Sequence, residues 1–270
     1  MIKSCDLGFK LSKWWITVLA SLAIAILIGN IDYVSQIAVA QEIPTVDLLP
    51  ESVRGSNILQ ICQPITVRVV KANSAGSGVI VGRSGNVYSV LTNWHVVESS
   101  NPLILTVDDL QHSLVTPPQH VGDADLALLQ FYSDIEYPVA QIAPQMPQIG
   151  DTVYTAGFPL TIGNNKNTVD LGNKAFRLTV GEVSIVPVKS LPQGYRLGYT
   201  NDTKAGMSGG PVFNDLGVLV GIHGRGKYRD PGFGVYLFED GSEPNSEQLE
   251  QMIKSSWGIP IGTYSDLTRQ

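Results

Sequence analysis

Cysteine is scarce in this chain of 270 residues, which contains only Cys5 and Cys62. Two cysteines cannot build a disulfide framework, so the fold must be held by its hydrophobic core. Basic residues are also few, because 18 Lys and Arg stand against 24 Asp and Glu, for a formal charge of −6, and no run of Lys or Arg exceeds two residues. Proteins that bind nucleic acid normally carry a basic excess or stripe. Nucleic acid is therefore not an expected partner.

Several motifs for metal and nucleotide binding are missing. The sequence has no His-Glu-x-x-His, no Cys-x-x-Cys and no Gly-x-x-x-x-Gly-Lys-Ser/Thr, and the pair Gly76 and Gly78 lacks a third glycine in register. We therefore expect no metal ion and no other cofactor.

The apolar content points to a folded, exported protein. Hydrophobic residues make up 43% of the chain and charged residues 16%, which is too apolar for a disordered polymer. Three lysines precede an uncharged run over residues 14–28, and Ala38-Val39-Ala40 is typical of a cleavage site. This run falls short of the roughly 20 residues that a membrane span needs. We expect a signal peptide over 1–40 and no stable membrane association after its removal; the alternative is a retained N-terminal anchor.

The remaining chain is rich in short stretches of β-forming residues. Turn signals bound nearly all of them, and no helical period lies between, which predicts an all-β protein. One helix is expected late, where Asn245 or Ser246 precedes Leu249, Met252 and Ile253 on one face. The predicted parts are an extension over 41–57 and two halves over 58–150 and 151–270. The expected strands cover residues 65–70, 78–81, 87–92, 103–107, 126–131, 152–156, 177–185, 195–200, 212–213, 217–222 and 234–238.

Three residues fit nucleophilic catalysis by serine. Ser208 lies in a glycine-rich turn, where the N–H groups of Gly206 and Ser208 can stabilise an oxyanion. His95 follows an apolar strand and can act as the base, and Asp125 opens another apolar strand and can orient the imidazole. Asp123 is the nearest competitor for the carboxylate. Each residue alone fits a turn, a buried histidine or a strand end, but the three together point to catalysis.

These residues lie in segments that resemble the motifs of trypsin-like serine peptidases. LTNWHVV (91–97) resembles the histidine motif, DLAL (125–128) the aspartate motif and GMSGGPV (206–212) the serine motif. GSGVI (76–80), AGFP (156–159) and VGEVS (180–184) are similar to the bacterial HtrA-type branch. The resemblance covers about residues 58–239. It implies two six-stranded antiparallel β-barrels, the first with His95 and Asp125 and the second with Ser208, and the triad in the cleft between them.

The order of the three residues excludes another serine hydrolase fold. The α/β-hydrolases also have a Gly-x-Ser-x-Gly turn, but their histidine follows the serine after further strands and helices. Here the only later histidine is His223, which is too close to Ser208. A protein of the same fold that binds peptides without cleaving them remains an alternative.

The resemblance also indicates where a substrate side chain would bind. Asp202 falls where trypsin-like enzymes hold Lys or Arg side chains. His223 and Thr203 instead resemble the residues with which glutamyl endopeptidases bind an acidic side chain. The positive charge of Arg225 would strengthen the attraction for such a side chain. Gly224 to Gly226 would pair with the substrate backbone as an added strand. We expect a monomeric, secreted endopeptidase that acts on polypeptides and prefers to cleave after acidic residues; a preference for basic residues is the alternative.

Overall fold

The computed structural model describes residues 51–71, 74–163, 166–229 and 235–267, which belong to one unit spanning Pro50–Gln270. The predicted signal peptide and residues 41–50 of the predicted extension lie outside the described residues. None of the helices in the described ranges is long and apolar enough to cross a membrane.

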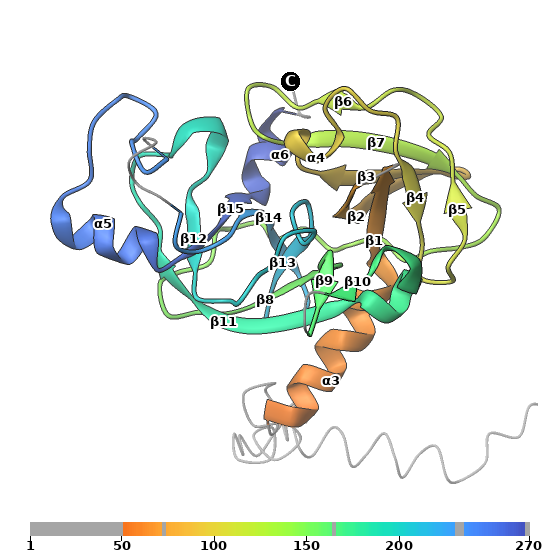
Figure 1. Cartoon of the computed structure of the whole chain (residues 1–270), viewed down its shortest axis with the longest axis horizontal. Coiled ribbons are helices and arrows are strands. Elements are labelled where there is room, and N and C mark those ends of the chain that lie inside the picture. Colours follow the sequence, from red (N-terminus) through yellow and green to blue (C-terminus); the bar gives the residue numbers. More distant parts are fainter. Residues whose placement is uncertain (1–50, 72–73, 164–165, 230–234, 268–270) are drawn as a thin grey trace, which may run out of the picture. The chain divides into compact units, whose positions relative to one another are not determined.

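Seven antiparallel strands form the first sheet, which curls over its own apolar core (Figure 1). Its strand order is β5-β4-β1-β2-β3-β7-β6, so that β5 and β6 are its edges. Each edge strand has two residues and the two are not paired, so the sheet stays open. The predicted closed barrel of six strands over 58–150 is therefore wrong. The strands are β1 (Thr66–Lys71), β2 (Ser74–Ser84), β3 (Val87–Thr92), β4 (Leu103–Leu105), β5 (Gln111–His112), β6 (Gln119–His120) and β7 (Ala127–Tyr132).

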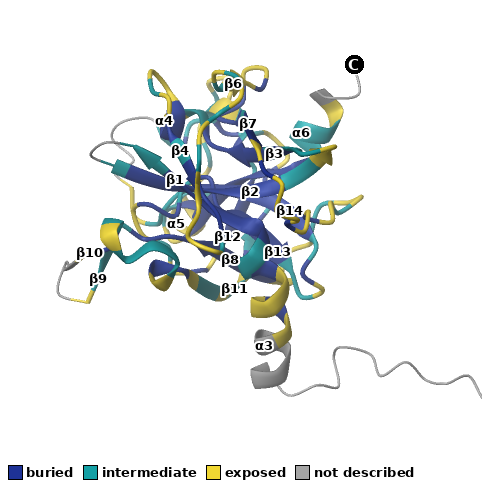
Figure 2. Ribbon diagram, turned by 90° about the vertical axis from the view of Figure 1, so that its right-hand side faces the viewer, coloured by how far each residue is buried: buried dark blue, intermediate teal, exposed yellow. Residues whose placement is uncertain are grey.

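The core of this sheet comes from β-branched and aromatic side chains. Val67 and Val69 of β1 are fully buried, and Tyr88 of β3 stacks on Phe131 of β7 with ring centroids 5.2 Å apart. Figure 2 shows this buried centre, with the exposed residues in the surrounding connections. Such side chains favour a pleated, half-buried surface, which explains why β3 and β7 were predictable from sequence.

Six strands close into a barrel in the second half of the chain, as predicted. Their order around the barrel is β11-β12-β15-β14-β13-β8. The fully buried Trp257 belongs to its core. One expected strand is wrong, because residues 235–237 form turns rather than continuing a strand. The barrel strands are β8 (Thr152–Gly157), β11 (Arg177–Ile185), β12 (Leu197–Tyr199), β13 (Pro211–Asn214), β14 (Leu219–Arg225) and β15 (Ser256–Pro260).

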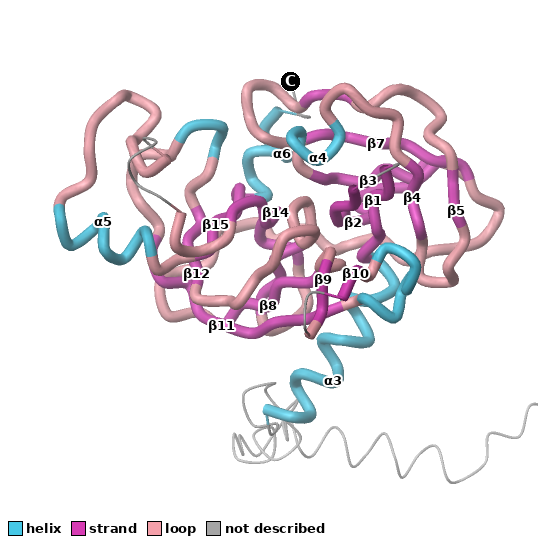
Figure 3. Tube along the Cα trace, viewed as in Figure 1, coloured by secondary structure: helices cyan, strands magenta, loops and turns pink. Residues whose placement is uncertain are grey.

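Helices are confined to the ends of the described chain and to short connections (Figure 3). The predicted late helix is confirmed: Asn245 Oδ1 accepts a hydrogen bond from the Gln248 N–H, and the Asn245 N–H donates one to Gln248 Oε1, which together form a capping box. Helix α3 was not predicted, although its last turn buries Ile58 and Cys62. The helices are α3 (Glu51–Cys62), α4 (Trp94–Val97), α5 (Ser246–Ile253) and α6 (Ile261–Leu267); a small hairpin is formed by β9 (Thr161–Ile162) and β10 (Lys166–Asn167), and single 3₁₀ segments are η2 (Gln63–Ile65), η3 (Val169–Ala175) and η4 (Pro192–Gly194).

The first sheet and the barrel are joined by buried polar contacts as well as by apolar packing. Arg68 of β1 is fully buried and donates to the Thr168 carbonyl at 2.7 Å and to the Thr168 hydroxyl at 3.0 Å. The Ser77 N–H of β2 donates to the Ser208 carbonyl at 2.8 Å. The Ser77 bond fixes β2 against the turn that carries Ser208, and the Arg68 bonds fix β1 against the connection between β10 and η3.

Candidate active site

His95 and Asp125 meet because neighbouring strands bring them together. Strands β3 and β7 pair with Thr92 opposite Ala127, so the residues after β3 lie beside those before β7. The His95 N–H donates to Asp125 Oδ1 at 2.9 Å, and His95 Nδ1 lies 2.6 Å from Asp125 Oδ2. With the carboxylate as acceptor, the proton sits on Nδ1 and leaves Nε2 free to accept another.

Asp125 is buried yet held in its charged form. Its side chain is 3 % exposed. Burial raises the pKa of this carboxyl, but the hydrogen bonds and charge of His95 and the hydroxyl of Tyr195 outweigh burial and leave the pKa below its ordinary value. An ionised Asp125 is therefore present at neutral pH to orient His95.

Tyr195 is a member of this site that sequence analysis missed. Its hydroxyl donates to Asp125 Oδ2 at 2.5 Å, and its ring is fully buried. Burial and the adjacent Asp125 charge raise the pKa of Tyr195 well above 10, so the phenol stays a donor. The linear sequence places Tyr195 only at the start of an apolar stretch and gives no sign that it lies against residue 125.

Ser208 lies at the same site, on the turn before β13. Its hydroxyl donates to the Gly224 carbonyl at 3.3 Å, and Gly224 lines one cavity with His95 and Asp125. The long O···O distance marks a weak bond. A rotation about the Cα–Cβ bond of Ser208 would release this hydroxyl to a neighbouring base.

The turn that carries Ser208 depends on Gly206 and is held by Ser77. Gly206 has φ of +95°, and a Cβ there would lie 2.6 Å from the Phe158 carbonyl, so only glycine fits. The Ser77 hydroxyl donates to the Gly206 carbonyl at 2.8 Å and accepts from the Phe158 N–H at 2.9 Å. Within the described chain, the N–H groups of Gly206 and Ser208 have no acceptor.

His223 lies under this turn, inside the barrel. It is 2 % exposed, and its Nδ1 lies 2.7 Å from the Tyr199 hydroxyl. Burial above all, together with the nearby His95, lowers the pKa of His223 to about 3, although a hydrogen bond with the Trp257 backbone acts in the opposite direction. The imidazole is neutral at physiological pH.

Two hydroxyl groups lie near Gly226, the residue that directly follows the strand carrying His223. Thr203 Oγ1 lies 3.1 Å from Ser256 Oγ, which donates to the Asn201 carbonyl at 2.9 Å. A Cβ on Gly226 would lie 3.7 Å from Thr203 Oγ1. The structure thus groups Thr203 with Gly226, two of the predicted substrate-binding residues, beside the Ser256 hydroxyl.

Asp202 is placed apart from these groups. It is exposed and lines a surface cavity of about 300 Å³ with Arg177, Thr179 and Lys204. Neither His95 nor Asp125 belongs to that cavity. Its position gives no support to a role in holding a basic substrate side chain beside Ser208.

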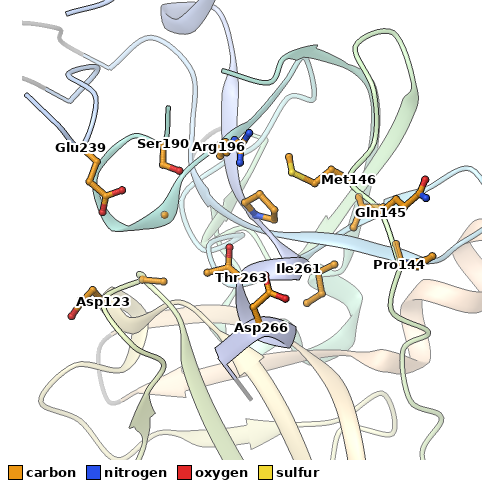
Figure 4. A pocket seen from close by; sticks show the side chains of 16 residues that line it. Asp123, Pro144, Gln145, Met146, Ser190, Arg196, Glu239, Ile261, Thr263 and Asp266 are labelled. Atoms are coloured by element: carbon orange, nitrogen blue, oxygen red, sulfur yellow. The ribbon is translucent and has the colours of Figure 1, made fainter. Parts of the chain in front are cut away.

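Asp123, the competing carboxylate, faces another cavity. That cavity measures about 570 Å³ and also holds Arg196, Glu239 and Asp266 (Figure 4). Asp123 is exposed there. Of the two aspartates, only Asp125 is brought to His95.

The buried neutral His223 predicts a pH-dependent stability. Between its folded pKa of about 3 and the ordinary value of 6.5, the unfolded chain binds a proton that the folded chain does not. The free energy of unfolding should therefore fall as pH drops below about 6.5, by up to about 1.4 kcal/mol per pH unit. Urea unfolding at several pH values between 6.5 and 4.5 measures this slope. His223→Gln should flatten it, whereas Tyr199→Phe, which removes only the hydroxyl partner, should keep it; equal slopes in wild type and His223→Gln would contradict the expectation.

A curled sheet, a closed barrel and a serine turn beside a His–Asp pair are typical of serine peptidases. Residues 76–222 match the family model described as a trypsin-like peptidase domain, and this match covers more than half of the chain. The chain therefore belongs to the trypsin-like peptidase family.

Curated relatives carry the names of serine endopeptidases. The chain is 26% identical over 159 residues to the serine endoprotease DegS of Haemophilus influenzae, which covers 57% of this chain and 42% of the relative. It is 28% identical over 210 residues to an HtrA-like serine protease of Staphylococcus haemolyticus, covering 72% and 32%. A glutamyl endopeptidase of Staphylococcus aureus is 26% identical over 198 residues, covering 66% and 55%. The chain thus spans about a third to a little over half of these relatives.

Solved structures show the same fold. A serine endoprotease from Yersinia pestis superposes with a TM-score of 0.54 at 22% identity, covering 79% of this chain and 65% of that one. An inactive mutant form of Rv3671c from M. tuberculosis gives a TM-score of 0.56 at 16% identity, covering 82% and 92%. At these identities the likeness concerns the fold alone.

Proposed function

We propose that this protein is an exported serine endopeptidase in which Ser208 is the nucleophile, His95 the general base and Asp125 the group that orients His95. The observation that carries the proposal is the grouping of the His95–Asp125 pair with Gly224, whose carbonyl holds the Ser208 hydroxyl. In this mechanism Ser208 attacks the substrate carbonyl while His95 Nε2 takes its proton. The N–H groups of Gly206 and Ser208 stabilise the oxyanion. The protonated His95 then gives this proton to the leaving amine as the peptide C–N bond breaks, and water releases the acyl group from Ser208 with the same imidazole as base.

We further propose that cleavage follows acidic residues. This choice is supported by the hydroxyl groups of Thr203 and Ser256 near Gly226, and by the imidazole of His223 under the turn that carries Ser208. Asp202, which a basic side chain would need, is exposed in a separate cavity with two cationic neighbours. One relative is also named a glutamyl endopeptidase. Because His223 is neutral before binding, it would offer a substrate carboxylate an N–H donor, and the carboxylate would favour protonation of the imidazole.

A peptide panel tests both parts of this proposal. Fluorogenic peptides that differ only in the residue before the scissile bond, Glu, Gln, Arg, Phe or Val, should be cleaved fastest when it is Glu. We expect kcat/KM for the Glu peptide to exceed that for its isostere Gln by about tenfold, since a charge-assisted hydrogen bond is worth roughly 1.5 kcal/mol.

Other results of the panel each have a definite meaning. Fastest cleavage after Arg would favour the basic alternative, and equal rates would refute both charged preferences. Binding of all peptides without any cleavage would favour the alternative of a peptide-binding protein.

A further inference from the structure

The cavity beside His95 is lined by two arginines that the proposed chemistry does not use. It measures about 310 Å³, and besides His95, Asp125 and Gly224 it is lined by Gln193, Tyr195, Arg225 and Arg229. Arg225 thus lines the same cavity as His95. The only carboxylate in the lining is Asp125, which already accepts from His95 and Tyr195. With His95 neutral, the cavity wall is left with an excess of positive charge.

Arg225 is positioned by neutral contacts. Its guanidinium lies 3.9 Å above the centre of the Tyr195 ring, and Nη2 donates to Gln193 Oε1 at 3.0 Å and weakly to the Pro192 carbonyl at 3.4 Å. Among the described residues, neither Arg225 nor Arg229 forms an ion pair with a carboxylate. A half-buried guanidinium that feels the charge of Asp125 but forms no ion pair with it presents a fixed positive group, which a planar anionic group complements well.

The geometry of a bound peptide indicates which substrate residue would reach this cavity. A peptide added as a strand along Gly224–Gly226 has successive side chains on opposite sides. A Cβ on Gly226 would point toward the Thr203 hydroxyl. A Cβ on Gly224 would collide with the Tyr195 hydroxyl. If one substrate side chain enters beside Thr203, the side chain of the residue before it lies on the opposite side of the added strand, and we assign that side to the cavity of His95 and Arg225.

We propose that the cavity formed by His95, Tyr195, Arg225 and Arg229 is a second specificity subsite that binds an acidic side chain of the residue preceding the one at the scissile bond. The inference rests on the proposed endopeptidase function and extends it, because the preferred substrates then contain two consecutive acidic residues. Arg225 supplies the fixed charge and Arg229, which is exposed at the rim, adds to the field.

The test compares peptides that all have the preferred residue immediately before the scissile bond. They differ only in the residue preceding that one, which is Glu, Gln or Lys. Wild-type kcat/KM should be about five to ten times higher for Glu than for Gln, and lowest for Lys. Arg225→Met, which keeps much of the side-chain stem over Tyr195, and Arg229→Gln should each reduce the Glu/Gln ratio, and the double variant should bring it close to one. Arg225→Lys should retain part of it. Raising the salt concentration should also reduce the ratio, because the pair is partly exposed.

A matched control is Arg83→Gln, which also removes one positive charge, but on the first sheet, where Arg83 pairs with Glu136. This variant should keep the wild-type Glu/Gln ratio of kcat/KM. If Arg225→Met disturbs Tyr195, both peptides slow equally and the ratio still reports the charge. If the wild type cleaves the peptides with a Glu/Gln ratio of kcat/KM equal to one, or if the double variant keeps the wild-type ratio, the proposed subsite is wrong. The proposed endopeptidase activity would still stand. If no peptide is cleaved, the proposed function fails, and calorimetric binding of the Glu and Gln peptides to wild type and double variant still decides whether the cavity selects an acidic side chain.

Discussion

Replacing Ser208 with alanine is expected to lower kcat for peptide hydrolysis by about 10⁶-fold, the loss typical when a serine nucleophile is removed. The physical reason is that no acyl-enzyme can form and water must attack without covalent catalysis. The fold should not change, because within the described residues the hydroxyl donates a single weak hydrogen bond, to the Gly224 carbonyl at 3.3 Å. Initial rates with the preferred fluorogenic peptide measure the loss, and circular dichroism checks the fold.

The control for this variant is Ser100→Ala, which also removes a hydroxyl bonded to a carbonyl, that of Val97 at 2.7 Å. It lies after helix α4 and should keep wild-type kcat. Hydrolysis by Ser208→Ala at more than a few per cent of the wild-type rate would mean that another group is the nucleophile.

Replacing Asp125 with asparagine is expected to lower kcat by about 10⁴-fold at neutral pH. The carboxylate accepts from both the N–H and Nδ1 of His95, and an amide that turns its NH₂ toward Nδ1 forces the proton onto Nε2. His95 then cannot accept the proton of Ser208. Single-turnover measurements with an ester substrate would place the loss in acylation.

Two further variants test whether the loss is specific to Asp125. Asp123→Asn changes the competing carboxylate, which faces the larger cavity in Figure 4, and should leave kcat unchanged. Tyr195→Phe removes one donor to Asp125 and should lower kcat roughly tenfold with little change in KM, since a hydrogen bond to a charged group is worth about 1.5–3 kcal/mol. A large loss in Asp123→Asn with little loss in Asp125→Asn would reverse the assignment.

The parts of the site that sequence could predict are those whose residue types follow from local chemistry. His95 follows a strongly patterned strand and Asp125 precedes another, and antiparallel pairing of these two strands brings both residues together. The Ser208 turn was likewise predictable, because its glycines occupy conformations and close approaches that other residues avoid. Motif order along the chain then distinguished this fold from other serine hydrolases.

Other features depend on contacts that no local pattern encodes. Tyr195 and Arg225 meet beside Asp125 only because the connection between β11 and β12 passes over the end of β14. Closure of the first sheet fails because its edge strands have two residues each, a length that composition did not reveal. Residues 235–237 are Val, Tyr and Leu, which favour strands, but in the structure they form a turn and a bend. Tertiary context decides such short segments more than intrinsic preference does.

The most direct test of the central claim is active-site labelling with a fluorophosphonate, followed by peptide mass spectrometry. The proposed mechanism predicts a single modification on Ser208, which is lost in His95→Ala and prevented by prior incubation with the preferred acidic peptide. No labelling of the wild-type protein, or a label on a residue other than Ser208, would contradict the claim that Ser208 is a nucleophile activated by His95.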